Sequence, residues 1–235
     1  MADTRRTDTA LRRLAAAVGV AVGSYAALVA NAWLRYGHAT QATGEESDPL
    51  LDGVMPDYEI VERHHVRVAA PVGVTFAAAN AIDFERSAIA RAIFKARELV
   101  MGSHATATTP SGSFLTQMQA IGWGELARTP GREVVMGAVT QPWLADVVFH
   151  PLPPAEFTAF REPGYVKIAW TLRADPIGEN ESIFRTETRA VATDSISRAK
   201  FRRYWSFVSP GIILIRWMML GPVKKDAERR APPLA

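Results

Sequence analysis

Hydrophobic and polar positions divide the chain into an uncharged N-terminal stretch, a short polar segment and a long mixed region. Between Arg13 and Arg35 lie 21 residues without a charge. As a helix rising about 1.5 Å per residue, this stretch crosses a bilayer core of about 30 Å. Residues 36–56 are polar, acidic and rich in turn formers, which predicts a linker. We therefore expect an N-terminal tail and transmembrane or signal-anchor helix over 1–35, a linker over 36–56, and a folded domain over 57–230.

After the linker, the pattern predicts one strand, two helices and a series of strands. Rough alternation over 57–68 indicates the first strand, and helices are expected over 72–82 and 85–100. Shorter strand-like runs follow at 114–127, 133–140, 143–149 and 156–161. The clearest strands are 165–174 and 182–193, because apolar residues alternate with polar ones there and a six-residue turn joins them.

A long helix is predicted to close the chain. Asp194 is a typical N-cap, and Pro210 with Gly211 interrupts the helical pattern. Basic residues flank the apolar stretch 212–220, which is too short to cross a bilayer. We expect this stretch to pack in the core, and the alternative is a second contact with anionic lipid headgroups.

The order of elements predicts an α+β domain, and it resembles the START-like (SRPBCC, polyketide cyclase-like) superfamily. Three stretches strengthen the resemblance: VRVAAPVGVTFAAANAIDFERS, REVVMGAV, and EPGYVKIAWTLRADPIGENESIFRTETRAVATD followed by AKFRRYW. The resemblance implies a helix-grip fold, in which a curved antiparallel sheet wraps round a long C-terminal helix. It also implies an apolar cavity for a lipid or another hydrophobic small molecule. Members of this superfamily include cyclases, hydrolases and proteins that only bind, so no catalytic residue is carried over.

Charge and composition exclude several other classes. The net charge is +3, of which residues 1–13 hold +2 (four arginines against two aspartates), so only +1 remains for the rest. This balance argues against a nucleic-acid partner, which normally requires a clustered basic face. The chain has no cysteine, and its five histidines lack metal-ligand spacing, since His64 and His65 point to opposite faces of a strand. We expect no metal and no cofactor.

The candidate ligand-binding residues are aromatic or lie on the last strand and helix. Large apolar side chains are expected to line a cavity or to fill the core. Glu187 and Arg189 share one face of their strand; they form a polar pair inside the cavity if that face is inner, and a solvated pair if it is outer. The full set is Trp123, Met136, Trp143, Trp170, Glu187, Arg189, Tyr204 and Trp205.

These observations predict a membrane-tethered domain that binds or transfers a hydrophobic small molecule or lipid. The alternatives are a cyclase or aromatase that uses Glu187 as a general base, and an interaction module with a filled core. Membrane attachment is expected through Leu14 to Leu34, with the N-terminus cytoplasmic and the domain outside, because arginines precede the segment. Cleavage near Ala32, within the small-residue motif Ala30-Asn31-Ala32, would instead release the domain.

Overall fold

The computed structural model describes residues 2–82 and 112–231, and every structural statement here concerns those residues. The helices and strands, in chain order, are α1 (Ala2–Arg35), η1 (Gly44–Glu46), α2 (Pro49–Val54), β1 (Ile60–Val68), α3 (Val72–Asn80), α5 (Phe114–Ala120), β2 (Gly124–Thr129), β3 (Glu133–Thr140), β4 (Phe149–His150), α6 (Pro154–Ala159), β5 (Val166–Gly178), β6 (Glu181–Ala192) and α7 (Ser195–Arg230).

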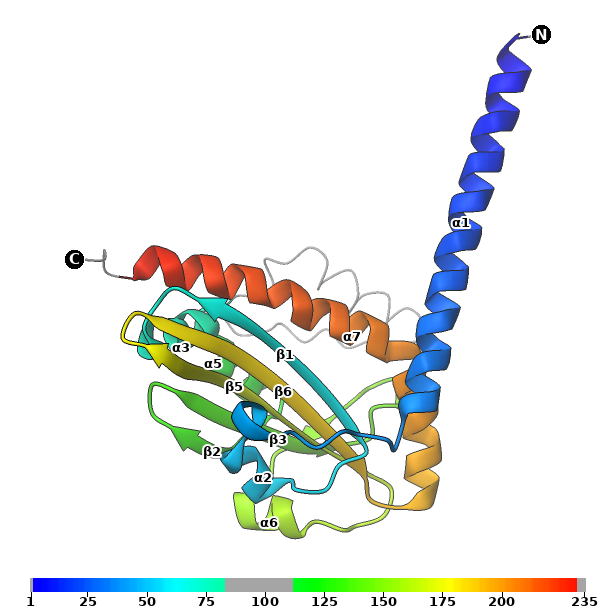
Figure 1. Ribbon diagram of the computed structural model, residues 1–235. Coiled ribbons are helices and arrows are strands. Elements are labelled where there is room, and N and C mark those ends of the chain that lie inside the picture. The colour runs from blue at the N-terminus through cyan, green and yellow to red at the C-terminus, as the bar shows by residue number, and fades with distance from the viewer. Residues whose placement is uncertain (1, 83–111, 232–235) are drawn as a thin grey trace.

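One antiparallel sheet forms the centre of the domain. Its strands lie in the order β1-β6-β5-β3-β2, and β4 pairs with β3. Helix α7 runs across one face, which we call the inner face, and α2 and α6 lie against the opposite, outer face (Figure 1). The predicted α+β architecture, with an antiparallel sheet and a long C-terminal helix, is confirmed. All eight residues of β3 are buried because the sheet is covered on both faces.

Residues 36–56 differ from the linker that their composition predicts. Leu51 and Met55 are buried against the outer face together with Phe157 and Val135. Asp48 caps α2 by accepting a hydrogen bond from the Leu51 amide at 2.9 Å. The segment covers apolar side chains of the sheet that water would otherwise contact, so it belongs to the folded domain.

Charged side chains hold this segment to the sheet. Arg189 is fully buried; it donates to Asp52 and Glu187, both at 2.7 Å, and to the Met55 carbonyl at 2.9 Å. Arg173 donates to the Ser47 carbonyl at 2.6 Å. We call this group the ionic network; its members are Asp48, Asp52, Arg63, Arg173, Asp175, Arg185, Glu187 and Arg189.

Two predicted strands are helical in the structure. The first half of 114–127 forms α5, because Ser113 accepts a hydrogen bond from the Thr116 amide and so caps a helix. Gly122 ends this element at φ +102°, where an added Cβ would lie 2.2 Å from the Phe149 carbonyl oxygen. The run 156–161 forms most of α6, which begins with Pro154 at its first position.

Other predictions have mixed outcomes. The run 143–149 is mostly turn and bend, and only Phe149–His150 pairs as a strand. The strands at 57–68 and 133–140, the helix at 72–82 and the final hairpin are confirmed within a few residues. The predicted helix over 85–100 lies outside the described residues.

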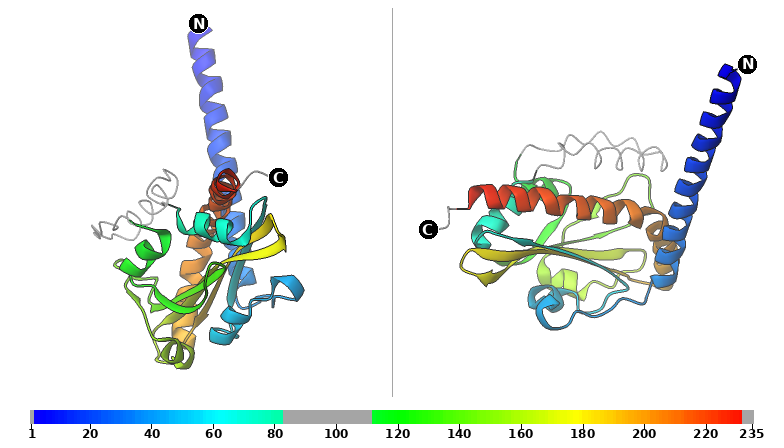
Figure 2. Two further views of the ribbon diagram at one scale, coloured as in Figure 1. Left: turned by 90° about the vertical axis from the view of Figure 1, so that its left-hand side faces the viewer. Right: turned by 45° about the horizontal axis from the view of Figure 1, so that its top comes forward.

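Helix α7 begins where the sequence predicts but continues through Pro210. The Asp194 side chain accepts from the amides of Ile196 and Ser197 at 2.8 and 2.9 Å. Near Pro210 the helix changes direction, so that its first part follows α1 and its second part crosses the sheet (Figures 1 and 2).

Helix α1 packs against the first part of α7 and then projects beyond the domain (Figure 2). The Tyr25 hydroxyl donates to the Phe207 carbonyl at 2.5 Å, and the Arg202 guanidinium donates to the Trp33 carbonyl and stacks on its ring. Two helical stretches, Ala15–Arg35 and Ser195–Arg230, are long and apolar enough to cross a membrane. Length and composition are equally typical of a signal sequence and of a core helix.

Loss of Arg189 tests whether the ionic network holds residues 48–58 to the sheet. We expect Arg189→Met to lower the free energy of unfolding by about 3–5 kcal/mol, because Glu187 keeps a buried charge with fewer partners. The matched control is Arg67→Met, which breaks the exposed pair with Glu181 and should cost less than about 1 kcal/mol. Denaturant titration of the full chain in detergent measures both. Equal effects would show that the network does not hold this segment.

Candidate functional site

Three of the predicted aromatic and apolar residues come together beneath α7. Trp170 and Met136 face each other on β5 and β3, and both are buried. The Trp170 ring lies 5.8 Å from that of Trp123 and 5.5 Å from that of Phe114, measured between centroids. With Phe184, these side chains form the larger apolar cluster on the inner face.

The other predicted aromatic residues gather at the opposite end of the same face. Phe201 lies 6.2 Å from Tyr204 and 6.0 Å from Trp205, measured between ring centroids. Trp143 packs against this second cluster, and the Lys200 ammonium lies 5.7 Å from its ring centroid. The predicted residues therefore do not form one group, because two apolar clusters occupy the two ends of the inner face.

Glu187 and Arg189 lie on the outer face, which corrects their assignment to the same site as Trp170. Glu187 accepts from Arg63 at 2.9 Å and from Arg189 at 2.7 Å, so both of its oxygens are held by guanidinium groups. The side chains that face α7 from this strand are instead Phe184, Thr186, Thr188 and Ala190. Glu187 is therefore a member of the ionic network and does not reach the inner face.

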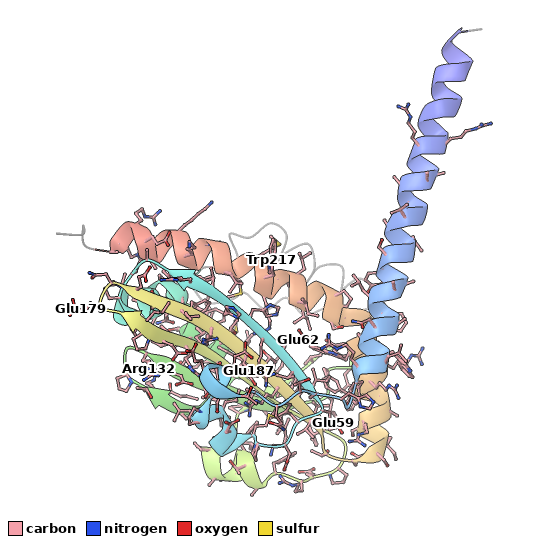
Figure 3. All side chains as sticks on the ribbon, viewed as in Figure 1. Glu59, Glu62, Arg132, Glu179, Glu187 and Trp217 are labelled. Atoms are coloured by element: carbon pink, nitrogen blue, oxygen red, sulfur yellow. The ribbon has the colours of Figure 1, made fainter. Side chains whose placement is uncertain are left out.

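A band of polar residues separates the two apolar clusters under α7. On β1, two polar residues stand between Ile60 of the second cluster and Val66 of the first. The register pairs them with Thr188 and Thr186 of β6. Helix α7 contributes Arg216, which lies between Ile212 of the second cluster and Leu220 of the first. We call this band the polar belt; it consists of Glu62, His64, Thr186, Thr188 and Arg216. Figure 3 shows Glu62 near α1 and α7, and Glu187 near α2.

Two polar atoms of the belt are buried without a hydrogen-bond partner, namely Nε2 of His64 and the hydroxyl oxygen of Thr188. The other such side-chain atoms among the described residues lie outside the belt, on Gln117, Glu133, Arg189 and Ser209. Arg216 donates to the Thr186 hydroxyl at 3.1 Å, and no carboxylate of a described residue lies within ion-pair distance of it. Each such atom forgoes a hydrogen bond that water would offer, at a cost of about 1–3 kcal/mol.

Burial also shifts the titration of the two belt residues on β1. It lowers the pKa of His64, and the nearby positive charge of Arg216 acts in the same direction. It raises the pKa of Glu62, against the opposing effects of Arg35 and Arg216. A neutral imidazole with a free nitrogen can accept or donate one hydrogen bond, and Arg216 supplies a positive charge beside it.

The belt therefore places unpaired hydrogen-bonding atoms and one positive charge between two apolar clusters. It offers hydroxyl groups, one imidazole nitrogen and a guanidinium, which together suit an oxygen-rich or anionic group. Sequence reasoning missed this site because it ranked residues on β5 and on the wrong face of β6. The available signal was Glu62 and His64, two polar residues on a face of β1 whose other residues, Ile60, Val66 and Val68, are apolar.

A small polar cleft lies on the outer face, beside the ionic network. It encloses about 20 Å³, room for one water molecule, and its lining includes Arg63, Arg173 and Glu187. Next to it, burial and a hydrogen bond with Asp48 raise the pKa of Glu133 to about 8. This cleft is too small for an organic ligand.

Comparisons with known proteins add little to this description. No family model matches the chain, and no curated protein matches it. Among solved structures, it is similar to the Zhui aromatase/cyclase from a Streptomyces species, at 14% identity and a TM-score of 0.26. That similarity covers 74% of this chain and 96% of the other. The function proposed below rests on the site itself.

Two threonines on opposite faces test whether the belt atoms lack partners. We expect Thr188→Val to raise the free energy of unfolding by about 1 kcal/mol, because it removes a buried hydroxyl without a partner. Thr171→Val should lower it by about 1–2 kcal/mol, because the Thr171 hydroxyl accepts from the Glu187 amide at 3.2 Å. Denaturant titration without added ligand gives both values. A loss of stability in Thr188→Val would show that its hydroxyl is paired.

The raised pKa of Glu133 predicts a specific loss of stability with pH. The folded state holds this proton up to a pKa of about 8, above the ordinary value of 4.5, so the stabilisation is complete below 4.5 and is lost as the pH rises through 8. Glu133→Gln should therefore lose less stability between pH 5 and pH 8 than the wild type, by on the order of a few kcal/mol.

Glu125→Gln is the matched control for this pH dependence. Its hydrogen bond from Arg128 holds the pKa of Glu125 below the ordinary value, so this carboxyl does not titrate between pH 5 and pH 8. The control should keep the wild-type pH slope. A pH dependence of stability in Glu133→Gln equal to that of the wild type would refute the raised pKa of Glu133.

Proposed function

We propose that the chain is a membrane-anchored helix-grip domain that binds an amphipathic small molecule or lipid between its sheet and α7. The polar belt binds the polar end of the molecule, and the apolar clusters contact its hydrocarbon part. Anchoring occurs through residues 14–34, which keep the domain beside a reservoir of such molecules. The helix-grip assignment itself rests on the sequence resemblance and on the arrangement of one long helix over an antiparallel sheet.

The observation that carries this proposal is the burial of unpartnered polar atoms in the belt. Proteins normally pair their buried polar groups, and exceptions require a structural or functional reason. Two of the six such side-chain atoms among the described residues, on His64 and Thr188, fall in the belt between the sheet and α7. Bound polar atoms of a ligand would supply the missing partners, which explains why the belt persists in a region otherwise suited to apolar packing.

The position of the two apolar clusters supports an elongated ligand. Trp170 of β5 lies on one side of the belt and Trp205 of α7 on the other, and both are buried. Aromatic and aliphatic walls with a few convergent polar groups are typical of small-molecule sites. Arg216 adds a positive charge, which favours a ligand with a negatively charged head.

A catalytic role is the second candidate, and one observation favours it. The lowered pKa of His64 keeps its imidazole neutral near pH 7, and its Nε2 atom is free. A neutral histidine in a dry site is a common general base. This role replaces the predicted one of Glu187, which is paired on the other face. Conversion of a bound ligand to a product of different structure, abolished by His64→Gln, would favour this candidate over simple binding.

Native mass spectrometry of the full chain, released from detergent micelles, tests the binding proposal. We expect dodecanoate to form a one-to-one adduct and to bind more tightly than dodecanol, because only the acid carries a negative charge for Arg216. Arg216→Met should weaken dodecanoate binding about tenfold or more, since a hydrogen bond to a charged group contributes about 1.5–3 kcal/mol. Dodecanol binding should change little.

Arg67→Met is the control, because Arg67 is exposed and lies on the other face of β1. It should keep the preference for dodecanoate. Absence of adducts with both compounds, or an unchanged preference in Arg216→Met, would contradict the proposed site.

A further inference from the structure

Helix α7 carries large apolar side chains that are exposed. Phe207, Leu214 and Trp217 are 54%, 44% and 65% exposed. The last two are three residues apart and lie on the second part of α7, beyond the bend. We call these three residues the apolar ridge. Figure 3 shows Trp217 on the side of α7 opposite the sheet.

Helix α1 presents a second apolar surface that starts beside the ridge. Val18, Val20 and Val22 are more than half exposed, and the most apolar window of this helix has no buried residue. The Tyr25 hydroxyl contacts the Phe207 carbonyl, so the ridge begins at the level of Tyr25 along α1. The exposed apolar surface of α1 therefore continues onto the side of α7 that faces away from the sheet.

The length of α1 beyond this contact decides how far a membrane must extend. Residues 14–24 are the uncharged part of α1 that lies beyond Tyr25, and they number eleven. At about 1.5 Å per residue they cover roughly 16 Å, about half of a bilayer core of about 30 Å. A membrane that contains all of residues 14–34 therefore extends past the contact at Tyr25 and reaches α7.

We propose that the side of α7 facing away from the sheet is a second membrane-binding surface. On this surface, the apolar ridge enters the boundary between the lipid headgroups and the acyl chains. Trp217 is suited to this boundary because its ring is apolar and its indole N–H is polar. The end of α7 carries Lys224, Lys225, Arg229 and Arg230 against Asp226 and Glu228, a surplus of +2 over residues 224–230. That surplus matches a surface containing anionic lipids. Burial of the ridge in lipid places α7 between the membrane and the polar belt.

The absence of cysteine from the chain allows a direct test by single-site labelling. An environment-sensitive fluorophore is attached to Trp217→Cys or Leu214→Cys in the full chain, reconstituted in phosphatidylcholine vesicles containing phosphatidylglycerol. We expect strong quenching by spin-labelled lipid and weak quenching by iodide in the buffer. Val22→Cys on α1 serves as the lipid-embedded reference.

Ala155→Cys is the matched control, because residue 155 is exposed on α6, on the opposite side of the domain (Figure 1). It should show strong iodide quenching and no lipid quenching. Circular dichroism of each labelled chain checks that it is folded.

Three outcomes would overturn the proposal. Lipid quenching at position 22 but not at 217 or 214 would show that α1 anchors the protein alone and that α7 faces water. Protection of 217 and 214 from both quenchers would show that another copy of the chain covers the ridge. Absence of lipid quenching at all three positions would show that neither helix enters the bilayer.

Discussion

Polar groups that are buried without hydrogen-bond partners lower the stability of the folded state. The arrangement of the inner face therefore depends on what pairs with the polar belt. The belt lies between two apolar clusters, beneath α7, whose buried residues Leu220 and Val223 belong to the first cluster. Valine or leucine at the belt positions would fill the same space without this cost. The belt is therefore best explained by a bound group that pairs with it, and its position fixes where the polar end of that group must lie.

The outer face differs from the inner face, because its charged side chains have partners. There, the ionic network pairs almost every charge, and residues 36–56 cover the apolar side chains around it. Because the segment begins directly at the end of α1, that helix continues into the part of the chain that covers the sheet. Tyr36 marks this joint: its hydroxyl donates to Glu59 at 2.7 Å, and Glu59 also pairs with Arg198 of α7. Burial, together with that acceptor, raises the pKa of the Tyr36 hydroxyl.

The sequence predicted the elements whose patterns are strong and regular. The final hairpin alternates along its length, and Asp194 carries an unmistakable cap, so both were correct. The run 156–161 is short, and the proline at the start of α6 favours a helix there over the strand that the pattern predicts. The polarity of 36–56 concealed Leu51 and Met55, whose burial depends on partners more than seventy residues away.

The site was harder to predict than the fold for a related reason. The face of β6 that turns inward depends on which side α7 covers, and alternation alone left Phe184 and Glu187 equally eligible. Tertiary packing decided in favour of the face with Thr186 and Thr188. The polar belt then emerges only when β1, β6 and α7 are placed together, since the two strands contribute two residues each and α7 contributes Arg216.

The most direct test of the central claim is a high-resolution crystal structure of the full chain, purified from cells without removal of bound lipids. The account predicts continuous density of a non-protein molecule, with a polar atom within hydrogen-bond distance of Nε2 of His64 or the hydroxyl of Thr188. Its apolar part should extend along Trp170 or Trp205. Density for water alone, pairing both Nε2 of His64 and the hydroxyl of Thr188, would contradict the account.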